Sequence, residues 1–138
     1  MKLSRTVAYA LQATLQLAQT DSGAPVPCSR LAAEGKMPER FLLQILRNLV
    51  AHGILSSTRG VEGGYMLERS ADEISLLELI EAIDGPMNAT LPVNEGLAPQ
   101  SKLKLETAMS EVTARARREL EAIKVSDLLP RTSTAAVG

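Results

Sequence analysis

Cysteines, aromatic residues and long apolar runs are scarce in this sequence, and each scarcity excludes a class of protein. The 138 residues include one cysteine, three aromatic side chains and no tryptophan. One cysteine cannot form an intrachain disulfide framework, so the chain fits a reducing compartment. No apolar run approaches the roughly 20 residues that cross a bilayer, and the first residues lead into an amphipathic pattern, not a signal peptide. We therefore expect a cytoplasmic protein with no membrane partner.

The composition that remains is aliphatic and unevenly charged. Hydrophobic residues make up 45% of the chain, which suffices for the core of one domain with an appendage. With few aromatics, that core must be Leu, Ile, Val, Ala and Met, which favours helices. The net charge of −1 divides into +3 over residues 1–70 and −4 over residues 71–138. The first half could therefore present a basic surface to an acidic partner such as nucleic acid.

Helical periodicity is clear in the first third of the chain. Apolar residues at helical spacing predict a helix from Ser4, its N-cap, to about Gln19. A shorter helix is predicted from about Ser29 to Glu34, with Gly35 ending it.

A second, longer helix is predicted directly after that glycine. Pro38 and Glu39 suit its first turn, and His52 with Gly53 ends it. Its predicted buried stripe consists of Phe41, Leu42, Ile45, Leu46 and Leu49. Two helices joined by a short turn with glycine are typical of a helix-turn-helix.

The opposite face of this second helix is polar. It carries Glu39, Arg40, Gln44, Arg47 and Asn48. Arg, Gln and Asn can pair in two places with base edges. A solvated helix face would have the same polarity, so this pattern alone leaves both interpretations open.

A glycine-rich stretch, TRGVEGGY at residues 58–65, separates two short strand candidates, Ile54–Thr58 and Tyr65–Leu67. A phosphate-binding loop would require Gly-Lys-Ser/Thr or a helix after the glycines, and a strand-like segment follows instead. A plain hairpin turn fits the glycines. Arg59 beside the polar helix face favours the wing of a winged helix, because arginine suits a narrow minor groove.

The second half of the chain predicts two more helices. Ser75 to Glu78 form a capping box that starts a helix ending at Gly85, and residues 87–99 form a loop. A long helix follows over residues 100–123, within a dimerisation segment of residues 100–129, and residues 130–138 are predicted to be a disordered tail. Its apolar row consists of Leu105, Met109, Val112, Ala116, Leu120 and Ile123. A row of this length requires a cover, either a second copy of the chain or its own domain.

Residues 1–86 resemble the Rrf2 family of bacterial transcription regulators. The resemblance rests on Tyr9-Ala10-Leu11, on Pro38-x-x-Phe41-Leu42-x-x-Ile45-Leu46-x-x-Leu49, and most specifically on Arg59-Gly60-x-x-Gly63-Gly64-Tyr65-x-Leu67. It implies a mainly α fold: a winged helix-turn-helix domain with a two-stranded wing (residues 1–86) and a long dimerisation helix. Residues 125–129 resemble the short helix that often closes the chain in this family.

The resemblance also implies a function: a homodimeric repressor or activator that binds double-stranded DNA. The helix after Pro38 would enter the major groove, Arg59 would reach the minor groove, and the chain start would lie near phosphates. The predicted DNA-contacting residues are Lys2, Ser4, Arg5, Ser29, Pro38, Glu39, Arg40, Gln44, Arg47, Arg59, Gly60, Gly63, Gly64 and Tyr65. The predicted dimerisation residues are the six of the apolar row.

Two departures from the family pattern have consequences. Iron–sulfur members often read bases with a glutamate where this chain has Leu43, and Arg40 replaces a smaller residue, so a different target sequence is expected. Many members also hold a cluster with three cysteines in the loop before the dimerisation helix, whereas residues 87–99 contain none. Because such clusters require thiolates, we expect a member without metal or cofactor.

Other functions have less support in the sequence. Cys28 near a helix start could be a reactive thiol or a small, partly buried apolar residue, and His52 fits a helix end. No nucleophile–base pair or carboxylate pair stands in a catalytic motif, so no enzyme is predicted. The alternative is a winged helix that binds a protein instead of DNA.

Overall fold

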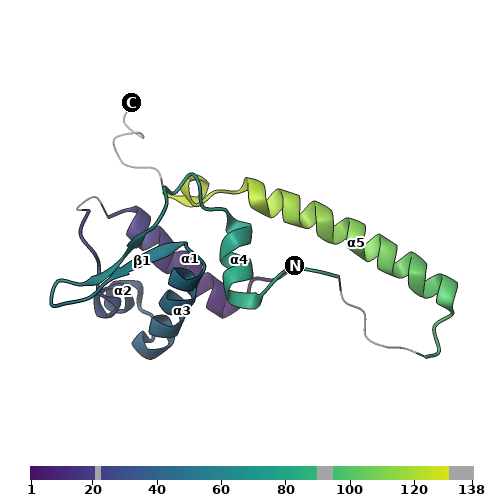
Figure 1. Cartoon of the computed structure of the whole chain (residues 1–138), viewed down its shortest axis with the longest axis horizontal. Coiled ribbons are helices and arrows are strands. Elements are labelled where there is room, and N and C mark those ends of the chain that lie inside the picture. The colour runs from purple at the N-terminus through teal and green to yellow at the C-terminus, as the bar shows by residue number, and fades with distance from the viewer. Residues whose placement is uncertain (21–22, 90–94, 131–138) are drawn as a thin grey trace.

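The computed structural model describes residues 1–20, 23–89 and 95–130, and the part of the predicted tail at 131–138 lies outside them. The order of elements is α1 (Arg5–Ala18), α2 (Cys28–Gly35), α3 (Glu39–Ala51), β1 (Leu55–Thr58), β2 (Gly64–Leu67), α4 (Leu76–Asp84), α5 (Pro99–Ala122) and the 3-10 helix η1 (Val125–Leu128). Helices α1–α4 and the hairpin form one body, and α5 extends away from it (Figure 1). The mainly helical winged fold predicted from the sequence is confirmed.

Helices α1 and α2 are joined by glutamine side chains. Ser4 caps α1 as predicted, since its Oγ accepts from the Val7 N–H at 3.1 Å. Gln12 Nε2 donates to the Gly35 carbonyl at 2.7 Å and Gln16 Nε2 donates to the Leu31 carbonyl at 3.2 Å. The bond to Gly35 satisfies a carbonyl in the last turn of α2 that the helix itself leaves unpaired.

The end of α2 differs from the prediction. Gly35 remains inside the helix, and Lys36 takes the left-handed conformation with φ 54°. The Lys36 N–H still closes the helix by donating to the Ala32 carbonyl. The turn between α2 and α3 is therefore made by a non-glycine residue, an uncommon position for a lysine.

Helix α3 buries four of the five residues predicted to face the core: Leu42, Ile45, Leu46 and Leu49. The prediction for Phe41 is wrong, because its side chain is 59% exposed. Phe41 lies at the edge of the stripe and belongs to neither apolar cluster of the described residues. The predicted helix end is confirmed at His52, whose Nδ1 lies 2.8 Å from the Asn48 carbonyl oxygen.

Strand β2 of the hairpin after α3 forms backbone hydrogen bonds along both of its edges. Strands β1 and β2 are antiparallel, with Leu55 opposite Leu67 and Thr58 opposite Gly64. On its other edge, β2 exchanges two backbone hydrogen bonds of 3.0 and 2.9 Å between Val26 and Tyr65. A Cβ on Gly64 would lie 2.4 Å from the Val26 carbonyl carbon, so only glycine lets the two backbones approach this closely.

Helix α4 begins with the predicted capping box. Ser75 Oγ accepts from the Glu78 N–H, and the Glu78 carboxylate accepts from the Ser75 N–H at 2.9 Å. Arg69, which follows the wing, donates to Glu78 Oε1 at 2.9 Å and to the Glu73 carbonyl at 3.2 Å. Partial burial raises the pKa of Glu78, but the Ser75 N–H and the Arg69 guanidinium outweigh burial and hold that pKa below its usual value.

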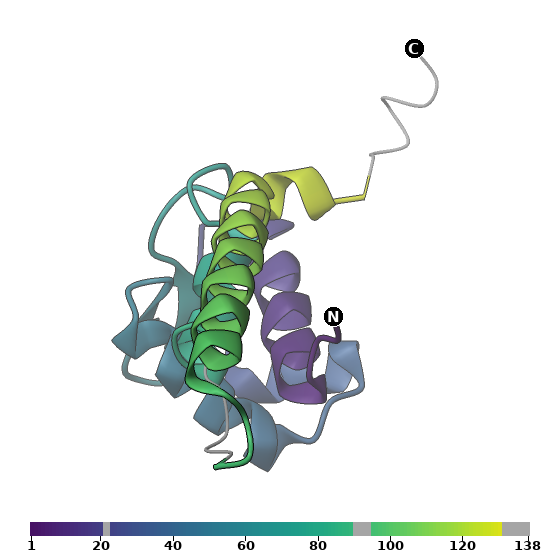
Figure 2. The same cartoon turned by 90° about the vertical axis from the view of Figure 1, so that its right-hand side faces the viewer.

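Helix α5 contacts the domain mainly through its C-terminal end. Leu120 and Ile123 join an apolar cluster with Val7, Leu77 and Ile80, so these two residues of the predicted dimerisation row pack within the chain. Arg117 forms an ion pair with Glu81 on α4 and donates to the Met87 carbonyl at 3.2 Å. Figure 2, turned by 90°, shows α5 in front of the rest of the domain.

The short closing helix is confirmed as η1. Val125 is fully buried, and its N–H donates to the Ile74 carbonyl at 2.9 Å. The Leu76 N–H donates to the Ile123 carbonyl at 2.8 Å. These bonds fix the C-terminal end of α5 to the start of α4, so the direction in which α5 leaves the domain is set by the fold.

Candidate nucleic-acid interface

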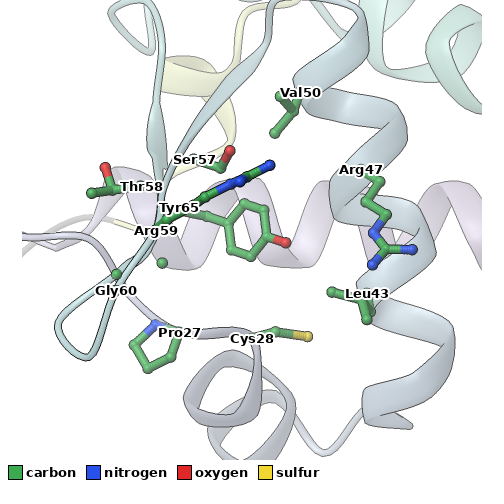
Figure 3. Close-up of a pocket in the computed structure, with 12 residues that line it drawn as sticks. Pro27, Cys28, Leu43, Arg47, Val50, Ser57, Thr58, Arg59, Gly60 and Tyr65 are labelled. Atoms are coloured by element: carbon green, nitrogen blue, oxygen red, sulfur yellow. The ribbon is translucent and has the colours of Figure 1, made fainter.

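A groove of about 530 Å³ lies between the start of α2, helix α3 and the wing (Figure 3). It is lined by Pro27, Cys28, Leu43, Arg47, Val50, Ser57, Thr58, Arg59, Gly60, Gly63, Gly64 and Tyr65. Three elements that are separate in the sequence therefore form one concave surface. Six of the predicted DNA-contacting residues line it: Arg47, Arg59, Gly60, Gly63, Gly64 and Tyr65.

Two arginines approach the groove from opposite walls. Arg47 projects from α3, and the side chain of Arg59 extends from the wing toward α3 (Figure 3). Both arginines are exposed. Neither forms any of the ion pairs found among the described residues. Two unneutralised cations across a groove attract a polyanion.

The wing loop has a fixed shape. Gly63 N–H donates to the Gly60 carbonyl at 3.0 Å, which closes the turn. A Cβ on Gly63 would lie 2.2 Å from the Thr58 carbonyl oxygen, so a side chain there would push the two arms of the loop apart. The loop therefore needs its glycine for a close backbone approach, and this approach sets where Arg59 leaves the wing.

The other eight predicted DNA-contacting residues are exposed but do not line the groove. Arg40 and Gln44 lie on the outer face of α3, and Pro38 and Glu39 lie at its start. Ser29 lies in the first turn of α2, and Lys2, Ser4 and Arg5 lie at the start of α1. The Ser4 hydroxyl is already engaged as a helix cap.

Sequence reasoning missed several residues of this surface. Leu43 and Val50 line the groove from α3, and Ser57 and Thr58 line it from β1. Ser57 and Thr58 are exposed at the outer end of β1, which strand alternation alone could not place beside α3. Phe41 was assigned to the core and lies on the surface instead.

Cys28 lies at the edge of the groove as a partly buried thiol. Burial raises its pKa, and the negative charge of Glu39 raises it further. Its S–H donates to the Glu39 carbonyl oxygen at 3.7 Å. All three effects favour the neutral thiol, which agrees with a packing role at this position.

Clusters of metal-ligating side chains and membrane-spanning helices were sought within the described part of the chain. No group of three or more His, Cys, Asp or Glu side chains within it could hold a metal ion. None of its helices combines the length and the apolar character that crossing a bilayer would require.

Comparison with known proteins agrees with this geometry. The global cysteine regulator CymR of B. subtilis superposes on this chain with a TM-score of 0.74 at 26% identity, over 93% of this chain and 95% of that one. The T. potens IscR structure shares the fold, with a TM-score of 0.67 at 22% identity over 98% of this chain and 96% of that one.

Curated sequences extend the comparison. A protein of Mycobacterium tuberculosis H37Rv classed among HTH-type transcriptional regulators is 36% identical over 89% of this chain and 75% of its own length. The HTH-type transcriptional regulator IscR of Escherichia coli O1:K1 is 33% identical over 65% of this chain and 56% of its own. The Rrf2 family model, described as an iron-dependent transcriptional regulator, matches residues 3–131. The chain therefore belongs to the Rrf2 family of DNA-binding transcription regulators, which are not enzymes.

Proposed function

We propose that this chain is a homodimeric, sequence-specific DNA-binding transcription regulator that acts in the cytoplasm. Helix α3 enters the major groove and the wing reaches the adjacent minor groove. The observation that carries this proposal is the groove between α3 and the wing, with Arg47 and Arg59 on its two walls. A helix and a hairpin held at a fixed distance match two neighbouring grooves of a duplex.

The outer face of α3 supplies the chemistry for base readout. Arg40 and Arg47 can pair with guanine O6 and N7, and Gln44 can pair with adenine N6 and N7. All three side chains are exposed, while Leu42, Ile45 and Leu46 hold the helix on the core. A recognition helix requires this combination of a fixed backbone and free polar side chains.

Phosphate contacts come from the ends of the elements around α3. Lys2, Ser4 and Arg5 are exposed at the start of α1, and Ser29 is exposed at the start of α2. Backbone N–H groups at helix starts and basic side chains both bind phosphates. These contacts orient the protein on the duplex without selecting a sequence.

Dimerisation occurs through α5. Met109 and Val112 are 39% and 56% exposed, and Leu105 is exposed as well, on a helix that extends from the domain (Figure 1). A second α5 would cover these residues, and a two-fold dimer would present two copies of α3 to a palindromic site.

The regulator works without an iron–sulfur cluster. Residues 86–99, which precede α5, contain no cysteine, and the one cysteine of the chain lies on α2. Because a cluster needs several thiolate ligands, the residues of this chain do not fit one. This distinguishes it from the iron dependence in the family's description.

The direct test is selection of genomic DNA fragments by the purified protein, followed by titration of an enriched duplex and a scrambled one. We expect the enriched duplex to bind on the order of 10³-fold more tightly than the scrambled one. Equal, weak binding of both duplexes would contradict the proposal. It would favour the alternative of a winged helix that binds a protein.

A further inference from the structure

Phe41 is a phenylalanine that the fold leaves in solvent. It is 59% exposed, the only phenylalanine of the chain, and part of neither apolar cluster of the described residues. Single exposed apolar residues are ordinary on protein surfaces, so exposure alone assigns no role to Phe41. The position of Phe41 on α3 does indicate a role.

Phe41 lies in the first turn of α3, which begins at Glu39. It follows Arg40 directly, and Gln44, three residues later, is its neighbour on the helix surface. The adjacent Leu42 and Ile45 are buried, so the backbone that presents the phenyl ring is fixed on the core. The ring is therefore held beside side chains that the proposed function assigns to base readout, near the helix end that makes most base contacts in helix-turn-helix proteins.

An apolar side chain in the major groove has one natural target. Base edges there present hydrogen-bond donors and acceptors, and the thymine 5-methyl group is the apolar exception. Phenylalanine is among the side chains that contact this methyl group, and glutamine pairs with adenine. An A·T-containing step would thus satisfy Phe41 and Gln44 together.

We propose that Phe41 is a specificity-determining residue that contacts the 5-methyl group of a thymine in the major groove. This rests on the proposed function, since it assumes that α3 enters that groove. It also assigns a feature of the DNA site: an A·T pair in each half-site whose methyl group contributes to affinity.

The experiment replaces each thymine of the selected duplex in turn with deoxyuridine, which pairs identically but lacks the methyl group. In the wild-type protein, one such replacement per half-site is expected to lower affinity about fourfold, the effect of burying one methyl-sized group. Phe41→Ala should bind the unmodified duplex more weakly and lose the dependence on that methyl group. Phe41→Leu should retain part of it.

The control is Val61→Ala. Val61 is fully exposed at the tip of the wing, which is assigned to the minor groove, where no methyl group is presented. The Val61→Ala variant should therefore show the same loss of affinity on deoxyuridine replacement as the wild-type protein. Thermal melts should show that all three variants fold, since both side chains are solvated.

The outcomes separate the two proposals. A wild-type protein that selects no duplex would overturn the proposed function and this inference with it. A specific duplex whose affinity ignores every thymine methyl, or a methyl dependence that survives in Phe41→Ala, would overturn the inference alone. So would unchanged DNA affinity in Phe41→Ala.

Discussion

At the residue scale, Arg59 and Glu62 on the wing are expected to have opposite effects on DNA affinity. Arg59 is the only basic residue between positions 54 and 68, and the same loop carries one acid, Glu62. If the wing enters a groove, the arginine attracts the duplex and the glutamate repels it. The loop therefore offers substitutions that move DNA affinity in opposite directions.

Arg59→Ala is predicted to weaken binding of the specific duplex by about 1–3 kcal/mol and to reduce the slope of log affinity against log salt by about one. Glu62→Gln should strengthen binding. Thermal stability should barely change in either, because both side chains are exposed on a turn. Titrations at several salt concentrations test this, with Arg118→Ala on α5 as the matched control. Equal salt slopes for Arg59→Ala and wild type would contradict a role of the wing in DNA binding and would indicate that residues 58–65 form an ordinary hairpin turn.

Residue-scale prediction from sequence succeeded where neighbours along the chain decide the outcome. The Ser4 cap and the Ser75–Glu78 capping box are local, and both are present. It failed for Phe41, because periodicity places a residue at the edge of a stripe without showing whether another element covers that edge. It also failed at Lys36, because glycine statistics do not show which of two adjacent residues turns the chain.

At the scale of elements, the join between the wing and α4 depends on one ion pair. Arg69 follows β2 and donates to Glu78, the residue that also caps α4. Its guanidinium also donates to the Gly53 carbonyl, which follows the C-cap of α3. The guanidinium thus links the segment after β2 to α4 and to the turn that follows α3. Its partner Glu78 gives this junction a dependence on pH.

The Glu78→Gln variant is predicted to lose the pH-dependent contribution that the Glu78 carboxylate makes to the folding stability of the protein. Because the pKa of Glu78 is lowered on folding, its contribution is complete above the unfolded value of about 4.3 and is lost as pH falls through the lower folded value. Glutamine can still cap α4 but cannot pair with the Arg69 charge, so a loss of at most about 1 kcal/mol at pH 7 is expected for this partly exposed pair.

Urea unfolding between pH 3 and pH 7 measures this difference. The curves of wild type and Glu78→Gln should converge at the acid end. The control is Glu73→Gln, whose backbone carbonyl keeps its bond from Arg69. A gap between wild type and Glu78→Gln that is constant with pH would show that the charge is irrelevant.

How elements meet could be predicted only in part. The order of helices and the hairpin follows from periodicity, caps and glycines. The groove does not, because it depends on the bridge between Val26 and Tyr65, which lie 39 positions apart and pair only after folding. The sequence analysis placed Gly64 in the loop before the second strand candidate, and it predicted neither the close backbone approach at this glycine nor its partner Val26.

At the scale of the whole molecule, the two ends of α5 have different surroundings. The C-terminal end packs on α1 and α4 through Leu120 and Ile123, whereas residues 101–112 are exposed throughout. The sequence predicted one continuous row for dimerisation, and the fold uses its last part internally. The exposed part remains the predicted dimer surface.

Met109→Glu combined with Val112→Glu is predicted to give monomers, because four carboxylates would face one another across a two-fold interface. The matched control is Thr107→Glu with Ala114→Glu, which adds the same charge to the opposite face of the helix and should remain dimeric. Light scattering at micromolar concentration measures both. Wild-type protein that is already monomeric would contradict dimerisation through α5.

The most direct test of the account is a hydroxyl-radical footprint of the wild-type protein on its selected duplex. Two copies of α3 related by a two-fold axis should protect two symmetric stretches whose centres lie about 10 base pairs apart, or a multiple of that. Protection of the flanking minor groove should be lost in Arg59→Ala. One unsymmetrical stretch, or no protection at concentrations where the protein is dimeric, would contradict the account.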